Sequence, residues 1–420
     1  MKITIQPTKL KGTLQVVSSK SLSHRYVIAA GLAKGTSTIK NALDSDDLTA
    51  TKNALSALGV TFNNNQVTGG ELKVIHNEID CNESGSTLRF MIPISMLLRE
   101  EIKFIGHGRL PLRPLDVYFD IFNQKHLYYK KDSEESNLPL TVKGPIKPGF
   151  YQMRGDVSSQ FLTGMLFALP LLKKDSVIEM TTPIESKGYV DLTLDVLKMF
   201  GIHILSVDQY FYIKGGQSYL PKEVTVEGDF SQAAFWMVAG LIGDEINLKS
   251  LNPISKQGDA KIVDIIKEMG GDIEYIDQDR MYKIEPSQTD GITIDLSQIP
   301  DLGPILMVLA GLSEKKTKFI GCNRLRMKES DRLDAMYQVL TKFGVPMEIS
   351  GDEAIIQGVK SFKGDLELDT FSDHRIAMAI AIAAIRADGP ITINHAEVVS
   401  KSYPNFFEIY KELGGQINES

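Results

Sequence analysis

The sequence predicts an α/β protein built from six copies of one structural unit. Six short polar stretches each lead directly into an apolar run of helical length, and successive stretches begin 65 to 73 residues apart. This spacing is too regular for chance and indicates an internal repeat. Within each copy, the pattern of apolar residues predicts a helix, a strand, a second helix and two further strands. The six polar stretches, called helix openings below, begin at Ser18, Glu83, Asp156, Asp229, Pro300 and Ser372.

The first helix of each copy is apolar on almost every side. Clear examples are residues 161–172, 233–242 and 305–312. A helix without a polar face is not stable at the surface of a globular protein. We therefore expect the first helices to be buried.

The second helix of each copy is amphipathic. Its apolar residues lie three and four positions apart, its start is polar or acidic, and in most copies a glycine lies near its end. These features predict helices with one face toward solvent at residues 46–59, 114–125, 189–201, 258–270, 330–344 and 405–414.

Short runs of β-branched or alternating residues between the helices predict the strands. These runs are residues 36–40, 101–105, 177–180, 211–214, 246–249, 292–296 and 391–393. Six copies divide naturally into two globular domains of three copies each, with a boundary near Glu227, where the fourth copy begins. A cleft between two such domains is a common place for a ligand, and we expect the active site there.

Composition excludes several classes of protein. The 420 residues are 43% hydrophobic, enough for large cores, and carry a formal net charge of −7. Proteins that bind nucleic acids or membrane surfaces usually carry an excess of Lys and Arg, so neither partner is expected. Two cysteines, Cys81 and Cys322, suggest neither a disulfide framework nor a cysteine metal site. The richest apolar run, residues 376–385, is shorter than the ~20 residues of a membrane span, and we expect a cytoplasmic protein without a targeting segment.

Several helix openings have the composition of an anion-binding site. A helix N-terminus presents unpaired N–H groups and the positive end of the helix dipole. Seven cations from separate loops or first turns could add to this field, which is enough for two multiply charged substrates. They are Lys20, Arg25, Arg109, Lys328, Arg332, Arg375 and Lys401. Taken singly, several of these openings could equally be ordinary helix caps with solvated charges.

Carboxylates and neutral polar groups occur in the same kind of position. Asp301 and Glu329 can transfer protons, while Ser158, Ser159 and Gln160 suit a phosphate or a ligand hydroxyl. No His or Cys cluster has metal-ligand spacing, and no Gly-x-x-x-x-Gly-Lys phosphate loop occurs. The pattern predicts a transferase site that uses neither a metal nor a cofactor.

These motifs occur in the order and spacing of a known family. From Ser18 to Pro404 the chain closely resembles the 5-enolpyruvylshikimate-3-phosphate synthases, the enolpyruvyl transferases of the shikimate pathway. The resemblance implies two similar domains, each of three βαβαββ repeats, in the arrangement known as an inside-out α/β barrel. It further implies that residues 19–227 form one domain, mainly on the shikimate 3-phosphate side, and that residues 1–18 and 228–420 form the other.

The resemblance also assigns roles to single residues. It implies that shikimate 3-phosphate is bound by Lys20, Ser21, Arg25, Ser158, Ser159, Gln160, Ser186, Tyr189, Asp301 and Lys328. It implies that phosphoenolpyruvate is bound by Lys20, Gly85, Arg109, Gln160, Arg332, Arg375 and Lys401. Asp301 would take the proton from the 5-hydroxyl, and Glu329 and Lys20 would serve proton transfer at the methylene carbon. The hydroxyl would add to C2 of phosphoenolpyruvate, and the tetrahedral intermediate would eliminate phosphate, in a protein expected to be a monomer.

The sequence departs from the common family pattern at four positions. Glu83 stands where many relatives have Asn, Ser86 replaces the usual Thr, and Arg324 occupies a position that is Asn in some members. Phe90 is bulkier than the residue that many relatives use. These changes leave the sensitivity to inhibitors that mimic phosphoenolpyruvate open.

Two alternatives to this function remain at the level of sequence. A sister enzyme with the same repeated fold acts on UDP-N-acetylglucosamine, but it usually carries a Cys in the loop that corresponds to residues 106–114, where this chain has none. A non-catalytic repeat protein that binds anionic metabolites would not require Asp301 and Glu329.

Overall fold

The computed structural model describes residues 1–419 and divides the chain into two compact units. The continuous unit is Ser18–Val226, and the split unit joins Met1–Val17 to the chain from Glu227 onward. The chain therefore passes from the split unit to the continuous unit after Val17 and returns after Val226. In the part that the structure describes, no helix is both long and apolar enough to cross a bilayer.

The continuous unit contains both helix types expected from the sequence. Its helices are α1 (Lys20–Leu32), α2 (Asp46–Ala57), α3 (Gly85–Ser95), α4 (Asp116–Lys125), α5 (Ser159–Ala168) and α6 (Lys187–Met199), with 3-10 turns η1 (Leu110–Leu112) and η2 (Leu169–Leu171). Its strands are β3 (Gly35–Lys40), β4 (Thr61–Asn63), β5 (Gln66–Gly69), β6 (Glu78–Asp80), β7 (Glu101–Ile105), β8 (Tyr128–Lys131), β9 (Leu140–Lys143), β10 (Phe150–Met153), β11 (Ser176–Met180), β12 (Ile204–Val207), β13 (Tyr210–Ile213) and β14 (Glu223–Thr225).

The split unit repeats this plan. Its helices are α7 (Phe230–Ile242), α8 (Ile262–Glu268), α9 (Gly303–Ala310), α10 (Asn323–Arg326), α11 (Arg332–Lys342), α12 (His374–Ala383) and α13 (Phe406–Glu412), with 3-10 turns η3 (Gly258–Lys261), η4 (Pro300–Leu302), η5 (Ala384–Arg386) and η6 (Ala396–Lys401). Its strands are β1 (Lys2–Gln6), β2 (Gly12–Gln15), β15 (Ile246–Lys249), β16 (Asp272–Ile276), β17 (Met281–Glu285), β18 (Thr293–Asp295), β19 (Lys316–Ile320), β20 (Met347–Ser350), β21 (Glu353–Gln357), β22 (Leu366–Asp369), β23 (Ile391–Asn394) and β24 (Gln416–Glu419). The short helix α10 was not expected from the sequence.

The sheets of the two units share one strand order. In each sheet the leading strand runs parallel to the second strand, and the third and fourth strands are antiparallel to their neighbours. Within residues 1–419 there are six such four-stranded sheets: β14-β3-β5-β4, β6-β7-β9-β8, β10-β11-β13-β12, β2-β15-β17-β16, β18-β19-β21-β20 and β22-β23-β1-β24. Each repeat is therefore a βαβαββ unit, as the family resemblance implied.

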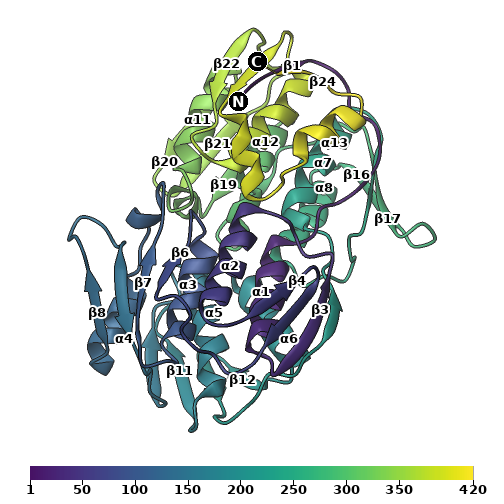
Figure 1. Cartoon of the computed structure of the whole chain (residues 1–420). Coiled ribbons are helices and arrows are strands. Elements are labelled where there is room, and N and C mark those ends of the chain that lie inside the picture. Colours follow the sequence, from purple (N-terminus) through teal and green to yellow (C-terminus); the bar gives the residue numbers. More distant parts are fainter. Residues whose placement is uncertain (420) are drawn as a thin grey trace. The chain divides into compact units, whose positions relative to one another are not determined.

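Three strands join repeats that are distant in sequence. Strand β1 pairs with both β23 and β24, so the purple N-terminal strand lies among yellow C-terminal strands in Figure 1. Strand β2 leads the sheet of the fourth repeat, and β14 leads that of the first. Among the leading strands, the sequence pattern predicted only β18, within the run 292–296. Strands β6 and β14 have only three residues each, and β2 and β14 come from distant parts of the chain.

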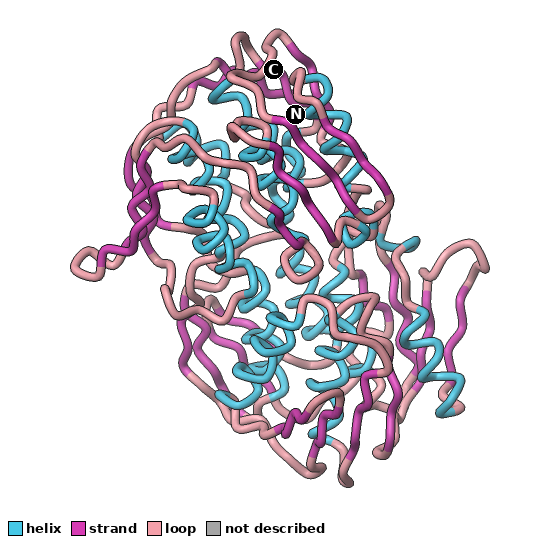
Figure 2. Tube along the Cα trace, turned by 180° about the vertical axis from the view of Figure 1, so that it is seen from behind, coloured by secondary structure: helices cyan, strands magenta, loops and turns pink. Residues whose placement is uncertain are grey.

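The first helices form the core of each unit. Every residue of α7, α9 and α12 is buried, as the apolar pattern predicted. Figure 2 shows the helices gathered inside each unit with the strands around them. Side chains at the openings cap five of these helices: Ser19, Ser84, Ser158, Asp229 and Asp373. Because the helix bodies are apolar, the polar groups of each unit's core concentrate at these N-termini.

The second helices mostly end as predicted, at a glycine with positive φ. The φ angles at Gly59, Gly201, Gly270, Gly344 and Gly414 lie between 82° and 95°. A residue without Cβ adopts this conformation at little cost and reverses the chain into the next strand. Helix α4 ends instead at His126, which has φ of 53°.

Helices α3 and α5 approach each other closely at Gly164. A Cβ atom there would lie 2.4 Å from the carbonyl oxygen of Arg89 and 2.5 Å from the hydroxyl of Tyr118, which no real Cβ tolerates. We expect Gly164→Ala to lower the free energy of unfolding by about 1–3 kcal/mol, because both helices must shift. Urea denaturation measures this loss. Gly70→Ala, with nothing within 4 Å of the added Cβ, is the control, and equal midpoints for the two variants would contradict the expectation.

Candidate active site

A half-buried carboxylate with three cationic partners lies at the start of α9. Asp301 belongs to η4, which immediately precedes that helix. Its Oδ1 lies 2.8 Å from Nη1 of Arg332 and 3.2 Å from Nζ of Lys328, and its Oδ2 lies 3.5 Å from Nη2 of Arg375. The three cations come from the loop after α10, from α11 and from α12. Sequence reasoning selected all four residues, and the structure brings them together.

A second carboxylate organises the same cluster. Asp373 caps α12 by accepting a hydrogen bond from the backbone N–H of Arg375 at 2.9 Å. Arg332 donates to it twice, from Nε at 2.8 Å and from Nη2 at 3.2 Å, and the Ser330 hydroxyl donates at 3.0 Å. Arg332 is 2% exposed and Asp373 is fully buried, so this bidentate pair is shielded from water. Arg332 consequently bridges the two carboxylates.

These contacts shift the acidities of the cluster. Burial favours the protonated form of Asp301, but the charges of Lys328, Arg375 and Arg332 outweigh it and hold its pKa well below the usual range. Burial lowers the pKa of Lys328 to about 8, with Arg324 and Arg332 acting in the same direction and Asp301 opposing them. Burial would also lower the pKa of Arg332, but Asp373 and Asp301 raise it. In the free protein Asp301 is an anion and Lys328 is a cation near its titration point.

Arg375 is oriented by a helix opening that carries no cation of its own. Its Nη2 donates to the Ser231 hydroxyl at 3.0 Å, and its Nη1 lies 3.3 Å from the backbone oxygen of Asp301. The Ser231 hydroxyl in turn donates to Asp229, the cap of α7, at 2.6 Å. This opening contains no Lys or Arg, and no binding residue was expected in it from the sequence. Its role in the cluster depends on the packing of α7 beside η4, which the sequence does not reveal.

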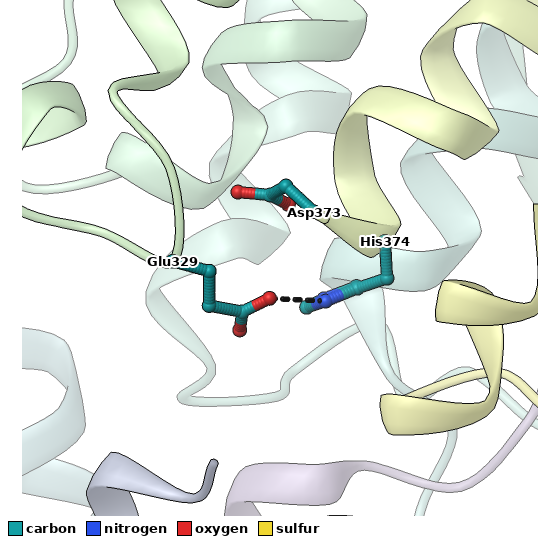
Figure 3. A group of neighbouring side chains, drawn as sticks. All are labelled: Glu329, Asp373 and His374. Carbon is teal, nitrogen blue, oxygen red and sulfur yellow. Dashed lines mark hydrogen bonds and ion pairs between the residues drawn. The ribbon is translucent and has the colours of Figure 1, made fainter. Parts of the chain in front are cut away.

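Glu329 lies next to the cluster and is paired with a histidine. Its Oε2 is 2.8 Å from Nδ1 of His374, as the dashed line in Figure 3 shows. Together with Asp373 these residues offer three ligand atoms within 4.8 Å of one another. However, both oxygens of Asp373 already accept hydrogen bonds from Arg332, and two further cations lie close by at Asp301. The electrostatics therefore favour an anion near this group over a metal cation.

Lys401 contacts the opening of α12. It belongs to η6, and its Nζ donates to the backbone oxygen of Ser372 at 3.1 Å. The split unit thus holds Asp301, Lys328, Glu329, Arg332, Arg375 and Lys401 at or beside the openings of α9 and α12.

The continuous unit has its own pair of cations at the opening of α1. Lys20 pairs with Asp47 at 3.0 Å, and both side chains are mostly buried. Arg25 lies one turn further along and donates to the Thr193 hydroxyl, the Ser21 carbonyl and the Tyr189 carbonyl. Burial lowers the pKa of Arg25 to about 10, so it remains a cation at neutral pH.

The opening of α5 provides a polar bridge to α3. The amide of Gln160 accepts from Arg89 at 2.7 Å and donates to the Ser86 hydroxyl at 2.9 Å. Ser158 caps the helix, and Ser159 is buried in its first turn. Ser86, which departs from the family pattern, is therefore the direct partner of Gln160.

Ser186 precedes α6 with a left-handed backbone, at φ of 54°, and its side chain is buried. Tyr189 follows in the first turn of α6, where its ring lies 5.8 Å from the guanidinium of Arg25. The structure thus brings Tyr189 to the first helix of the unit, through Arg25.

The loop of residues 106–114 presents Arg113 to the first turn of α3. A Cβ on Gly85 would lie 2.6 Å from Nη1 of Arg113, so that guanidinium lies directly against the first residue of α3. Arg109, which the resemblance assigned to phosphoenolpyruvate, is exposed. The carboxylate of Glu83 lies against Gly108 of the same loop, within 2.7 Å of a Cβ added there. The sequence contained both arginines, but only the path of the loop distinguishes them.

Known proteins resemble the chain over its whole length. The family model of EPSP synthase (3-phosphoshikimate 1-carboxyvinyltransferase) matches residues 5–410. The 3-phosphoshikimate 1-carboxyvinyltransferase of Clostridium kluyveri is 47% identical, and that of Clostridium acetobutylicum is 46% identical, each over 99% of this chain and 98% of the relative.

Solved structures give the same picture. An EPSP synthase from Acinetobacter baumannii has a TM-score of 0.82 at 26% identity and covers 100% of both chains. The enolpyruvyl transferase NikO from Streptomyces tendae is 15% identical and shares the fold, with a TM-score of 0.81 over 100% of this chain and 98% of that one. The family resemblance read from the motifs is confirmed: the chain belongs to the EPSP synthase (3-phosphoshikimate 1-carboxyvinyltransferase) family.

Proposed function

We propose that the chain transfers the carboxyvinyl group of phosphoenolpyruvate to the 5-hydroxyl of shikimate 3-phosphate and releases inorganic phosphate. Membership of the family over nearly the whole chain supports this reaction, a step of the shikimate pathway to aromatic amino acids. The observation that carries the proposal is the Asp301 cluster, a carboxylate that contacts Lys328, Arg332 and Arg375. A carboxylate can accept the hydroxyl proton, and the cations can bind anionic substrates.

We propose the substrate contacts that the family resemblance implied. We assign shikimate 3-phosphate to Lys20, Ser21, Arg25, Ser158, Ser159, Gln160, Ser186, Tyr189, Asp301 and Lys328. We assign phosphoenolpyruvate to Lys20, Gly85, Gln160, Arg332, Arg375 and Lys401. We also assign it to Arg109, as the resemblance implied, and we add Arg113 because its guanidinium lies against Gly85.

The electrostatics of the cluster explain how Asp301 becomes a base. In the free protein its pKa is too low for efficient proton abstraction. Phosphoenolpyruvate carries a carboxylate and a phosphate. Both groups compete with Asp301 for contact with Arg332 and Arg375. Losing part of this stabilisation raises the pKa of Asp301 and increases its proton affinity. Its proton acceptance then coincides with the attack of the 5-hydroxyl on C2.

The second proton transfer takes place at the methylene carbon of phosphoenolpyruvate. C3 must gain a proton when the tetrahedral intermediate forms and lose one when phosphate leaves. We propose that Glu329 and Lys20 serve these proton transfers at C3. His374 orients Glu329 through their 2.8 Å contact, and Asp47 orients Lys20 at 3.0 Å. The cytoplasmic location and the monomeric state expected from the sequence remain predictions.

Phosphate release tests the proposed function directly. The purified protein is mixed with shikimate 3-phosphate and phosphoenolpyruvate, and free phosphate is measured, with each substrate alone as a control. We expect release only when both are present. Release with UDP-N-acetylglucosamine and phosphoenolpyruvate, but not with shikimate 3-phosphate, would identify the sister activity instead.

The Asp301→Asn variant tests the role of Asp301 as a base, because it nearly preserves the shape of the side chain and removes the carboxylate. We expect turnover to fall by about 10²–10⁴-fold, the range for loss of a general acid or base, because the amide cannot accept the hydroxyl proton. Circular dichroism and thermal unfolding verify that the variant is folded. Glu353→Gln, on an exposed sheet position paired with Lys318, is the matched control and should keep normal turnover. A folded Asp301→Asn variant with near-normal turnover would remove Asp301 from the mechanism.

Lys328 should impose an alkaline limit on substrate capture. Its pKa of about 8 means that it is charged below this pH and neutral above it. We expect kcat/KM for shikimate 3-phosphate to decline above about pH 8, because the profile of kcat/KM reports the free enzyme. In Lys328→Arg the side chain stays charged, so this decline should disappear even if absolute activity is lower. An identical alkaline limb in both proteins would show that another group titrates there.

A further inference from the structure

A chain of buried hydroxyl contacts links the first three helices of the continuous unit. Nδ1 of His24 on α1 lies 2.8 Å from the hydroxyl of Thr51 on α2, which lies 2.7 Å from the hydroxyl of Thr87 on α3. Thr87 donates to the hydroxyl of Ser84, the cap of α3, at 2.8 Å. All four side chains are buried. The contacts run across the boundary between the first and second repeats.

Both ends of this chain lie beside residues assigned to phosphoenolpyruvate. His24 lies one helical turn after Lys20, and Thr51 one turn after Asp47, the partner of Lys20. Helices α1 and α2 are therefore tied twice, by the Lys20–Asp47 ion pair and by the His24–Thr51 contact. At the other end, Ser84 directly precedes Gly85, and its hydroxyl accepts the backbone N–H of Thr87 at 3.2 Å.

The protons in the chain can be ordered in one direction. Burial lowers the pKa of His24 to about 3, with Lys20 and Arg25 adding to this effect against Asp47, so the imidazole is neutral and carries one N–H. With that proton on Nδ1, His24 donates to Thr51, Thr51 donates to Thr87, and Thr87 donates to Ser84. The other tautomer would bury an N–H at Nε2, an atom with no hydrogen-bond partner in the part of the chain described.

This arrangement restricts the geometry of the three helix starts. The Thr51 hydroxyl donates once and accepts once in this order, and the Thr87 hydroxyl also lies 3.3 Å from the backbone oxygen of Asp47 on α2. A shift of any one helix would therefore leave a buried polar group unsatisfied. The apolar side chains of the same helices pack in the core of the unit through contacts that are not directional. The directional hydrogen bonds of the hydroxyl chain, in contrast, are satisfied at only one relative position of α1, α2 and α3.

We propose that His24, Thr51 and Thr87 are positioning residues that set the separation between Lys20 and the Ser84–Gly85 turn, and thereby the fit of phosphoenolpyruvate. The proposal rests on the proposed function, which places phosphoenolpyruvate at Lys20 and Gly85. Gly85 is assigned to phosphoenolpyruvate alone, whereas Ser158, Ser159 and Ser186 belong to α5, α6 or their caps and not to α1, α2 or α3. Its loss should therefore affect one substrate more than the other.

Thr51→Val is the decisive variant because it removes the central hydroxyl and nearly preserves the volume of the side chain. We expect KM for phosphoenolpyruvate to rise about tenfold, since small misplacements of binding groups are costly. KM for shikimate 3-phosphate and its binary affinity, measured by calorimetry, should change less than twofold. Thr51→Ser retains the hydroxyl and should restore KM for phosphoenolpyruvate to near the wild-type value.

Thr289→Val is the matched control for the loss of a buried hydroxyl. Thr289 contacts the hydroxyl of Ser313 at 2.8 Å in the split unit, away from the helix openings, and should lose stability without a change in either KM. Equal increases in both KM values in Thr51→Val, or no increase beyond the control, would show that the chain is only structural. If the wild-type protein released no phosphate from the two substrates, the proposed function would fall and this proposal with it. Normal wild-type turnover with an unchanged Thr51→Val would overturn the positioning role alone.

Discussion

The carboxylate of Asp373 connects the fold of the split unit to its charged cluster. It caps α12, accepts the hydroxyl of Ser330 and binds Arg332 in a bidentate pair. Arg332 then holds Asp301 at the start of α9. A fully buried ion pair of this kind does not stabilise a fold by much overall, because desolvation offsets most of the attraction, but losing one partner leaves an uncompensated charge. The positions of α9, α11 and α12 are therefore coupled through one side chain.

The helix openings contribute different side chains to the Asp301 cluster, and each kind of side chain has a different part in it. Asp229 and Ser231 contribute no charge, yet they orient Arg375. The charge of Asp373 is neutralised by Arg332 inside the protein. The carboxylate of Asp301, by contrast, is 18% exposed and lies among three cations. In the continuous unit, Lys20 and Arg25 are likewise held by neighbours before any substrate arrives. Side chains fixed in this way lose little conformational freedom on binding, which is the advantage of preorganisation.

Much of the fold was predictable because it follows from periodicity. Apolar runs identified the buried first helices, and amphipathic spacing with terminal glycines identified the second helices. Apart from β18, the leading strands were missed from pattern alone, because three residues such as Glu78–Asp80 carry too little periodicity. The pairing of β1 with strands more than 380 positions away was not predictable from the pattern either. Among site residues, the residue types identified Asp301, Arg332 and Arg375. They could not place Arg113 beside Gly85 or assign a role to Ser231, since both depend on tertiary packing.

The charge balance of the cluster also explains why its base should act only with substrate bound. Three cations around one carboxylate make a weak base, whose proton affinity is suppressed in the free protein. Anionic substrates compete for the same cations, and each contact that they take from Asp301 increases its proton affinity. Under the proposed function, the base therefore gains strength in the complex in which the 5-hydroxyl is present to be deprotonated. The same exchange keeps Arg332 and Arg375 paired with an anion before and after binding, so no buried cation is left uncompensated at any stage.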